Sequence, residues 1–199
     1  MGEFMKYLVS AAVLACGLAQ PAFAQDAEET TNDKAGLRIE GRLIYETPTV
    51  SNVEEEGDVY KLGSAVAFGG EVGFDIAVGK SVVVGPYANY EFSSVENCDG
   101  ADCVSETDSY TVGLQIGVKV GSNGMIYLKG GYASMGLEAS DGSLSFKERG
   151  NGIGGAIGYE RGFGEHLYGR VEFGYSDNGK IFGIDFQRRH AGIALGARF

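Results

Sequence analysis

The sequence has no tryptophan, only two histidines, and 16 basic residues against 27 acidic ones in a chain of 199. The resulting net charge of −11 argues against a nucleic-acid partner, because phosphate binding needs an excess of Lys and Arg. The scarcity of histidine leaves few candidates for acid–base or nucleophilic catalysis. After the N-terminal region, no segment approaches eighteen uninterrupted apolar residues, so we expect no transmembrane helix.

The N-terminal region has the three parts of a secretory signal peptide. Met5-Lys6 precedes an apolar run over 7–18, and small residues end at a cleavage site after Ala24. A second initiator at Met5 makes residues 1–4 resemble an expression-vector remnant. We therefore expect a signal peptide over 5–24, a flexible segment over 25–36 and the folded domain over 37–199. Cys16 follows a loosely lipoprotein-like sequence, which leaves its lipidation open as an alternative.

Strict alternation of apolar and non-apolar side chains recurs in eight segments of the remaining chain. It is clearest from 110 to 120, where every second residue is apolar and the residues between are mostly small or polar. A period of two predicts β-strands, and most of these are about long enough to cross a bilayer when tilted. The segments are 37–45, 64–76, 82–92, 110–120, 125–137, 153–161, 166–175 and 190–199.

The connections between these segments alternate in length. Short, mostly glycine-rich links at 78–81, 121–124 and 162–165 predict tight turns, whereas the links between the first and second, third and fourth, and fifth and sixth segments are longer, polar and acidic. A soluble up-and-down barrel would carry its charged face outside. Here the non-apolar face is mostly Gly, Ala and Ser, so it points inward. We predict an all-β fold, an eight-stranded antiparallel up-and-down transmembrane β-barrel.

The interior of such a barrel is only wide enough for side chains to fill, which gives the 33 glycines a role as space beside long residues. Pro86 removes one ladder hydrogen bond, so we expect a bulge or local distortion there. Aromatic residues near the strand ends are expected to lie at the membrane interfaces. They are Tyr45, Tyr90, Phe92, Tyr110, Tyr132, Tyr159 and Tyr175.

This pattern resembles the small eight-stranded outer-membrane barrels, a group that includes the OmpA transmembrane domain, OmpX and the opacity-type surface proteins. The resemblance covers residues 37–199 and implies an outer-membrane location, contact with outer-membrane lipid and lipopolysaccharide, and insertion by the barrel-assembly machinery. It does not imply cell-wall anchoring, because the OmpA-type peptidoglycan-binding domain is missing. On this resemblance the last strand carries the assembly signal, comprising His190, Gly192, Ile193, Leu195, Ala197 and Phe199.

Charged side chains of both signs occupy the inward faces and are expected to pair in the lumen, because an unpaired buried charge is costly. The predicted network comprises Arg38, Glu40, Arg42, Glu71, Glu91, Lys119, Lys129, Glu160, Arg170, Glu172 and Arg198. We interpret it as a structural plug. The related barrels leave open a second interpretation, a gate whose pairs switch and so make a narrow, low-conductance pore.

Cys98 and Cys103 occur in an acidic segment of a chain that passes through an oxidising compartment, which predicts a disulfide. A metal site of two thiolates and nearby carboxylates remains an alternative. Acidic residues make the long-loop end strongly negative, so we expect solvated loops or a contact with divalent cations or a basic surface partner. They are Glu54, Glu55, Glu56, Asp58, Asp99 and Asp102, supplemented by Glu96, Glu106 and Asp108.

The sequence contains no motif typical of an enzyme active site. Residues 150–155 fit the string G-x-G-x-x-G but lead into a strand, which excludes the dinucleotide-binding interpretation. His166 is predicted at a short turn and His190 on the lumen side, and neither is followed by Ser in a catalytic spacing. We expect no enzyme activity, cofactor or metal. The prediction is a structural or surface-interaction protein, with a narrow pore as the first alternative and a lipid-modifying enzyme as the second.

Overall fold

The computed structural model describes residues 32–51 and 58–199, which lie in one compact unit, Asn32–Phe199. Residues 1–31, which include the predicted vector remnant, the predicted signal peptide and Cys16, lie outside the described residues, as do Glu54, Glu55 and Glu56. In the described ranges the strands are β1 (Gly36–Ser51), β2 (Val59–Lys61), β3 (Ala65–Val78), β4 (Val82–Phe92), β5 (Glu96–Asp99), β6 (Asp102–Val120), β7 (Gly124–Ser140), β8 (Ser145–Gly162), β9 (Leu167–Ile181) and β10 (Ile184–Arg198).

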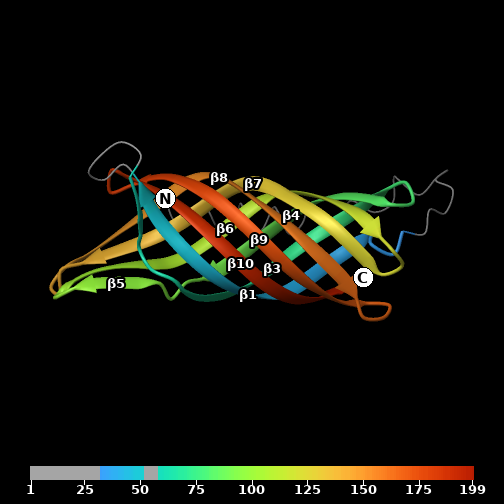
Figure 1. Ribbon diagram of the computed structural model, residues 1–199, viewed down its shortest axis with the longest axis horizontal. Helices are drawn as coiled ribbons and strands as arrows, with labels where there is room; N and C mark the ends of the chain where they lie inside the picture. The colour runs from blue at the N-terminus through green and yellow to red at the C-terminus, as the bar shows by residue number, and fades with distance from the viewer. Residues whose placement is uncertain (1–31, 52–57) are drawn as a thin grey trace, which may run out of the picture. The chain divides into compact units, whose positions relative to one another are not determined.

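Eight of these strands close into an antiparallel ring (Figure 1). Its order is β1, β3, β4, β6, β7, β8, β9, β10, and β10 pairs with β1 from Arg38↔Arg198 to Ser51↔Asp185. The short β2 and β5 pair with β1 and β6 outside the ring. The predicted eight-stranded up-and-down barrel is confirmed. Within the described ranges, no helix has the length and apolar character of a membrane span.

The two faces of the wall separate as the alternation predicts. Leu114 leaves 61% of its surface exposed on the outside, whereas its neighbour Gln115 is 1% exposed on the inside. Most of the large exposed hydrophobic side chains of the ring strands belong to the outer face and form an apolar belt around the barrel. The predicted interface aromatics belong to the same outer face, where Tyr90 packs edge-on against Phe92 with ring centroids 5.0 Å apart. An apolar outside and a polar inside suit a wall surrounded by lipid.

The two ends of the barrel differ. At the short-turn end, β3–β4, β6–β7 and β8–β9 are joined by residues 79–81, 121–123 and 163–166, close to the predicted turns. At the opposite end, which we call the long-hairpin end, the strands continue well past the belt. The predicted long link between the fifth and sixth segments is wrong, because β7 and β8 extend until only Asp141–Leu144 connects them. Likewise, β9 and β10 meet at Phe182-Gly183, both with positive φ.

An apolar cluster explains why the strands extend past the belt at the long-hairpin end. Met135, Leu137, Ile181 and Phe186 turn inward at the long-hairpin end and pack together, with Val50, Leu62 and Ile184 against them. Burial of these apolar side chains stabilises the paired hairpins beyond the belt. These residues lie on the inner face, which the alternation assigns to small and polar side chains, so the sequence does not reveal an apolar cluster there.

Two bulges change which side chains point inward. The β6–β7 register shifts between Glu106 and Asp108, so Thr107 is an extra residue on β6. The β9–β10 register shifts between Asp185 and Gln187. An extra residue inverts the alternation beyond it. Glu106, expected in an exposed acidic segment, is therefore turned inward and is only 2% exposed.

No bulge occurs at Pro86. The β3–β4 pairs run to Gly73↔Tyr87 and resume at Ile76↔Val84 in the same register, so the distortion is a local gap in the ladder. Strand β4 approaches β3 very closely here, since a Cβ on Gly85 would lie 1.9 Å from the carbonyl oxygen of Phe74.

Candidate functional site

The candidate site is the network of charged side chains that fills the lumen. Its centre is Glu71 on β3, which receives an ion pair from Arg38, one from Arg42 at 2.9 Å and one from Lys129 at 2.7 Å. Arg170 lies 3.6 Å away. All of these side chains are almost completely buried. A single carboxylate from one strand therefore holds cations from β1, β7 and β9.

Glu172 on β9 is the second central carboxylate. It pairs with Arg42 at 2.6 Å and with Lys129 at 2.7 Å, and it accepts a hydrogen bond from the hydroxyl of Tyr127 at 3.1 Å. The ring of His190 lies 3.5 Å away. Arg42 thus joins both central carboxylates and also reaches Glu91 at 2.9 Å, so it links opposite walls of the barrel.

Towards the short-turn end the network continues through two more carboxylates. Glu160 pairs with Arg170 at 2.8 Å and with Arg198 at 2.7 Å. Asp75 accepts hydrogen bonds from Arg38 at 3.0 Å and from Arg198 at 3.1 Å. These bonds tie β10, the last strand, to β3 and β8 across the interior.

Residues 32–34, just before β1, contact the short-turn mouth. Asn32 donates from its side chain to the carbonyl of Val82 at 3.3 Å, and Lys34 donates to the carbonyl of Asn123 at 3.0 Å. Lys34 also lies 3.4 Å from Glu160. Asn32 and Lys34 are both buried, so this part of the segment expected to be flexible is packed against the barrel.

Towards the long-hairpin end the network ends around Arg188 on β10. This guanidinium pairs with Glu46, with Glu91 at 2.7 Å and with Glu106 at 3.4 Å. Among the described residues, neither carboxylate oxygen of Glu106 has a hydrogen-bond partner. The apolar cluster of Met135, Leu137, Ile181 and Phe186 lies at this same end.

The buried charges of the described lumen come close to balance, with seven cations facing eight carboxylates. Near-complete pairing is the condition under which a dry interior tolerates so many charges. The structure places ten of the eleven predicted network residues in this buried set; Lys119 instead pairs with Asp33 at 2.5 Å and keeps part of its side chain exposed. The additional charged members are Lys34, Glu46, Asp75, Glu106 and Arg188.

Some of the additional members had a signal in the sequence. An even number of positions separates each of them from a predicted inward residue of the same strand, so each lies on the inner face. Asp75 follows Glu71 in this way, Glu46 follows Arg42, and Arg188 precedes His190. Glu46 and Arg188 lie just beyond the predicted ends of their strands, which is why the alternation was not followed to them. Glu106 had no such signal, because the bulge at Thr107 places it on the inner face.

Inward glycines make room for the large lumen side chains. Tyr127 pairs across strands with Gly158, and Tyr168 pairs with Gly196. A Cβ on Gly196 would lie 2.5 Å from Cζ and the hydroxyl oxygen of Tyr168. The Tyr168 hydroxyl donates to Glu40 at 3.0 Å. The glycines thus let aromatic rings lie flat across the wall and enter the network.

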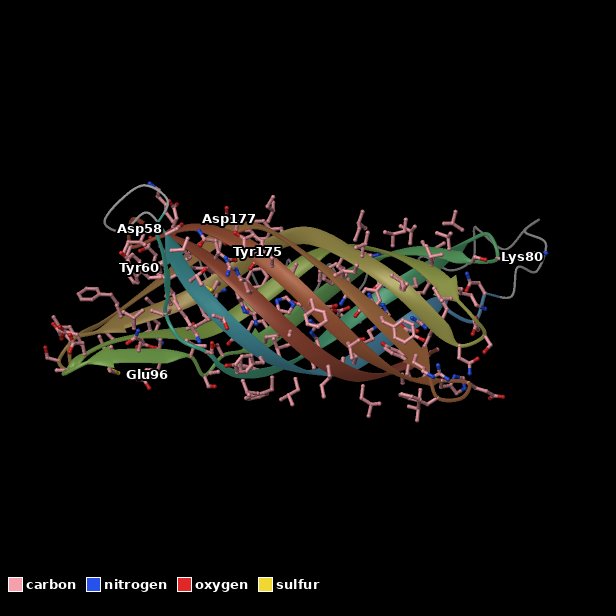
Figure 2. The ribbon with its side chains drawn as sticks, in the orientation of Figure 1. Asp58, Tyr60, Lys80, Glu96, Tyr175 and Asp177 are labelled. Carbon is pink, nitrogen blue, oxygen red and sulfur yellow. A yellow bond between two sulfur atoms is a disulfide. The ribbon has the colours of Figure 1, made fainter. Side chains whose placement is uncertain are left out.

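Outside the belt, β5–β8 project from the long-hairpin end (Figure 1). Cys98 and Cys103 form the predicted disulfide across the β5–β6 hairpin. Because both sulfur atoms are bonded to each other, neither is a thiolate that could bind a metal ion in this oxidised protein, although Glu96 lies beside them. Figure 2 shows Asp58 and Glu96 at this end and Lys80 at the opposite one.

Six of the nine predicted acidic residues are described. Asp99 and Asp102 are exposed at the hairpin tip, whereas Asp58 is half-buried. Asp141, in the β7–β8 turn, adds a further exposed carboxylate. Backbone N–H groups of Leu144 and Ser143 donate to this carboxylate, and they lower the pKa of Asp141 below its usual value. The projecting end therefore carries fixed negative charge at neutral pH.

The terminal strand places its predicted signal residues on both faces. His190 and Gly192 point inward, while Ile193 and Leu195 are exposed on the belt and Ala197 lies in register with Leu167. Phe199 exchanges backbone hydrogen bonds with Leu37 at 2.8 and 3.0 Å and stays 70% exposed. His166 lies in the β8–β9 turn, where its ring stacks on that of Phe199.

Comparison with known proteins identifies the same architecture. The family described as outer membrane protein beta-barrel domain matches residues 9–199. No curated protein matches the chain. Similar solved structures include Neisserial surface protein A, with a TM-score of 0.56 and 13% identity over 83% of this chain and 98% of that one. OprG from Pseudomonas aeruginosa has a TM-score of 0.52 and 13% identity over 84% of this chain and 98% of that one. Ail, the attachment invasion locus protein of Yersinia pestis, in complex with the heparin analogue sucrose octasulfate, has a TM-score of 0.52 and 11% identity over 81% of this chain and 99% of that one.

At such low identity the structural likeness shows the fold alone. The family match, in contrast, spans nearly the whole chain, and it agrees with the closed ring, the apolar belt and the polar lumen. This chain belongs to the outer-membrane β-barrel domain family and resides in the outer membrane.

Proposed function

We propose that this protein is a closed barrel that serves as a membrane scaffold for a surface-interaction structure, without enzymatic activity. In this arrangement the short-turn end faces the periplasm and the long-hairpin end faces the cell exterior. The observation that carries the proposal is the contrast between a lumen filled by ion pairs and strands that continue outward into the projecting β5–β8. Loops on a rigid scaffold are where binding residues concentrate.

A filled lumen should not conduct. The refolded protein in a planar bilayer is expected to be silent at the single-channel level, because Glu71 and Glu172 hold cations from opposite walls across its centre. The Arg42→Ala variant, once shown to be folded, should open to small ions, since it loses the side chain that joins both carboxylates. Steady conductance of the unchanged protein would contradict the closed barrel and support the alternative of a narrow pore.

A surface role should depend on the projecting tips. Bacteria displaying the protein are expected to adhere to cultured epithelial cells, and adherence should fall to background when residues 54–58 and 98–103 are both deleted. Display levels are matched by surface labelling. A deletion in the short turn at 121–123, adjusted to keep the hairpin closed, is the control for general damage. Adherence that survives both tip deletions would contradict this role.

The chemistry of a surface partner should differ from that seen with Ail, whose solved complex contains the polyanionic sucrose octasulfate. Exposed carboxylates dominate the projecting end here, including Asp99, Asp102 and Asp141. They would repel a sulfated polyanion and favour a basic partner. The same carboxylates could bind divalent cations that bridge to lipopolysaccharide, which we include in the proposal as a contact with outer-membrane lipid.

The barrel-assembly machinery is the proposed partner during insertion. Phe199→Ala should reduce the amount of assembled protein in cells, because the ring stacks on His166 but remains largely exposed for recognition. Folding of the purified chain into lipid vesicles should change little, since Phe199 pairs with Leu37 only through its backbone. Comparing cell-envelope levels with folding yields in vesicles tests this prediction. An equal loss in both would make the effect structural and contradict a recognition role.

A further inference from the structure

The projecting parts of β5–β8 form a four-stranded sheet with two unlike faces. One row across it is Asn97, Val104, Ala139 and Phe146, which are in register from strand to strand. The row on the opposite face is Glu96, Ser105, Glu138 and Lys147. We call the first of these the inner face, because its residues alternate in phase with Glu106 and Leu137 in the lumen.

The inner face contains an apolar groove. A hollow of about 460 Å³ lies over Val104, Ala139 and Phe146 and is bordered by Leu62, whose carbonyl accepts a hydrogen bond from Asn97 at 2.8 Å. Phe146 is 61% exposed there, and Leu144 in the adjoining turn is equally exposed. Large apolar side chains left open outside the lipid belt are a marker of an interaction surface.

Carboxylates surround this groove. Asp99, Asp102 and Asp141 line it, and none of the described lining residues is basic. Asp99 and Asp102 lie directly opposite each other at the end of the β5–β6 ladder. Like charges in that position destabilise a hairpin. A cationic group placed between them would relieve the repulsion while its neighbours reach the apolar floor.

We propose that the inner-face groove binds a cationic polypeptide segment that presents an apolar side chain next to a lysine or arginine. The apolar side chain packs on Phe146 and Val104, and the cation lies between Asp99 and Asp102. Electrostatic complementarity at the rim selects the partner and aligns it, and burial of the apolar group adds affinity. This inference rests on the proposed surface role and specifies its partner.

The test measures binding of a short amidated peptide of alternating lysine and phenylalanine to the protein in zwitterionic nanodiscs, with empty nanodiscs subtracted. Asp99→Asn combined with Asp102→Asn should weaken binding by about tenfold or more, and Phe146→Ser should weaken it at least about fivefold. The asparagine pair keeps the hairpin's shape and removes its repulsion, so this variant is expected to fold.

The matched control is Glu96→Gln combined with Glu138→Gln, which removes the same charge from the opposite face. It should change binding by less than about twofold. If the two double variants lost the same amount of binding affinity, the effect would come from the overall negative charge and not from the groove, which would overturn the proposal. Binding that persists when glutamate replaces lysine in the peptide, or an absence of peptide binding while Ca²⁺ alone binds at Asp99 and Asp102, would overturn it as well.

The adherence experiment separates this inference from the proposed function. If adherence requires the tips but peptide binding does not depend on the inner face, the inference fails and the surface role stands. If peptide binding depends on the inner face but adherence survives the tip deletions, the groove stands as a binding site and the cell-surface role fails.

Discussion

Glu71→Ala is expected to lower the free energy of unfolding in lipid vesicles by about 3–5 kcal/mol, the usual cost of removing one partner of a buried ion pair. Glu71 is almost fully buried and is the shared acceptor of Arg38, Arg42 and Lys129. Its loss leaves these cations with fewer carboxylate partners and little access to water. Urea titration, followed by the fraction that migrates as folded protein in unheated gels, measures the effect.

Two comparisons make this result specific. Lys147→Ala removes an exposed pair with Glu138 on the projecting sheet and should leave the urea midpoint unchanged. Glu71→Gln keeps the size of the side chain and should still be strongly destabilising, because the missing component is charge. If Glu71→Gln were as stable as the unchanged protein, packing and not ion pairing would hold the lumen together.

Gly196→Ala is expected to destabilise the barrel by about 1–3 kcal/mol or to prevent its refolding, as overpacked interiors do. The added Cβ would overlap the Tyr168 ring, whose Cζ and hydroxyl oxygen lie 2.5 Å from its position. That ring is 1% exposed and its hydroxyl is bonded to Glu40, so it has no space to yield. Urea titration in vesicles again provides the measurement.

A double-mutant cycle with Tyr168→Leu identifies the cause. Once the ring is shortened, Gly196→Ala should cost less than about half of what it costs in the unchanged protein. Gly41→Ala is the control on the outer face, where a Cβ would meet no atom of the described residues within 4 Å. An undiminished cost in the Tyr168→Leu background would show that the ring is not the obstacle, and the strand backbone would then be responsible.

The alternation in the sequence was sufficient for the architecture. A side-chain period of two assigns each residue of a strand to one of two faces, and small and charged residues on one face with large apolar ones on the other leave a single arrangement that suits lipid outside and a narrow interior. For this reason the strand core from 110 to 120, the short turns and ten members of the lumen network were predictable. The disulfide followed from the compartment and the spacing of Cys98 and Cys103.

Partnerships within the lumen could not be read from the sequence. The alternation places Glu71 and Arg170 on inner faces, but their separation depends on barrel closure and on the tilt of the strands, which set the height of each residue. The same holds for the contact of Lys34 with Glu160, because the residues before β1 show no periodicity that would direct them to the mouth.

Only the tertiary structure decided what lies beyond the belt. The sequence by itself determined an eight-stranded outer-membrane barrel with a charged interior, because two-residue periodicity is a local property of the chain. The extra residue at Thr107 inverts that periodicity and turns Glu106 into the lumen. The cluster of Met135, Leu137, Ile181 and Phe186 extends the hairpins through contacts between distant strands, and so creates the projecting sheet on which Phe146 is exposed. Such contacts exist only after the strands have found their register, which is why local patterns do not reveal them.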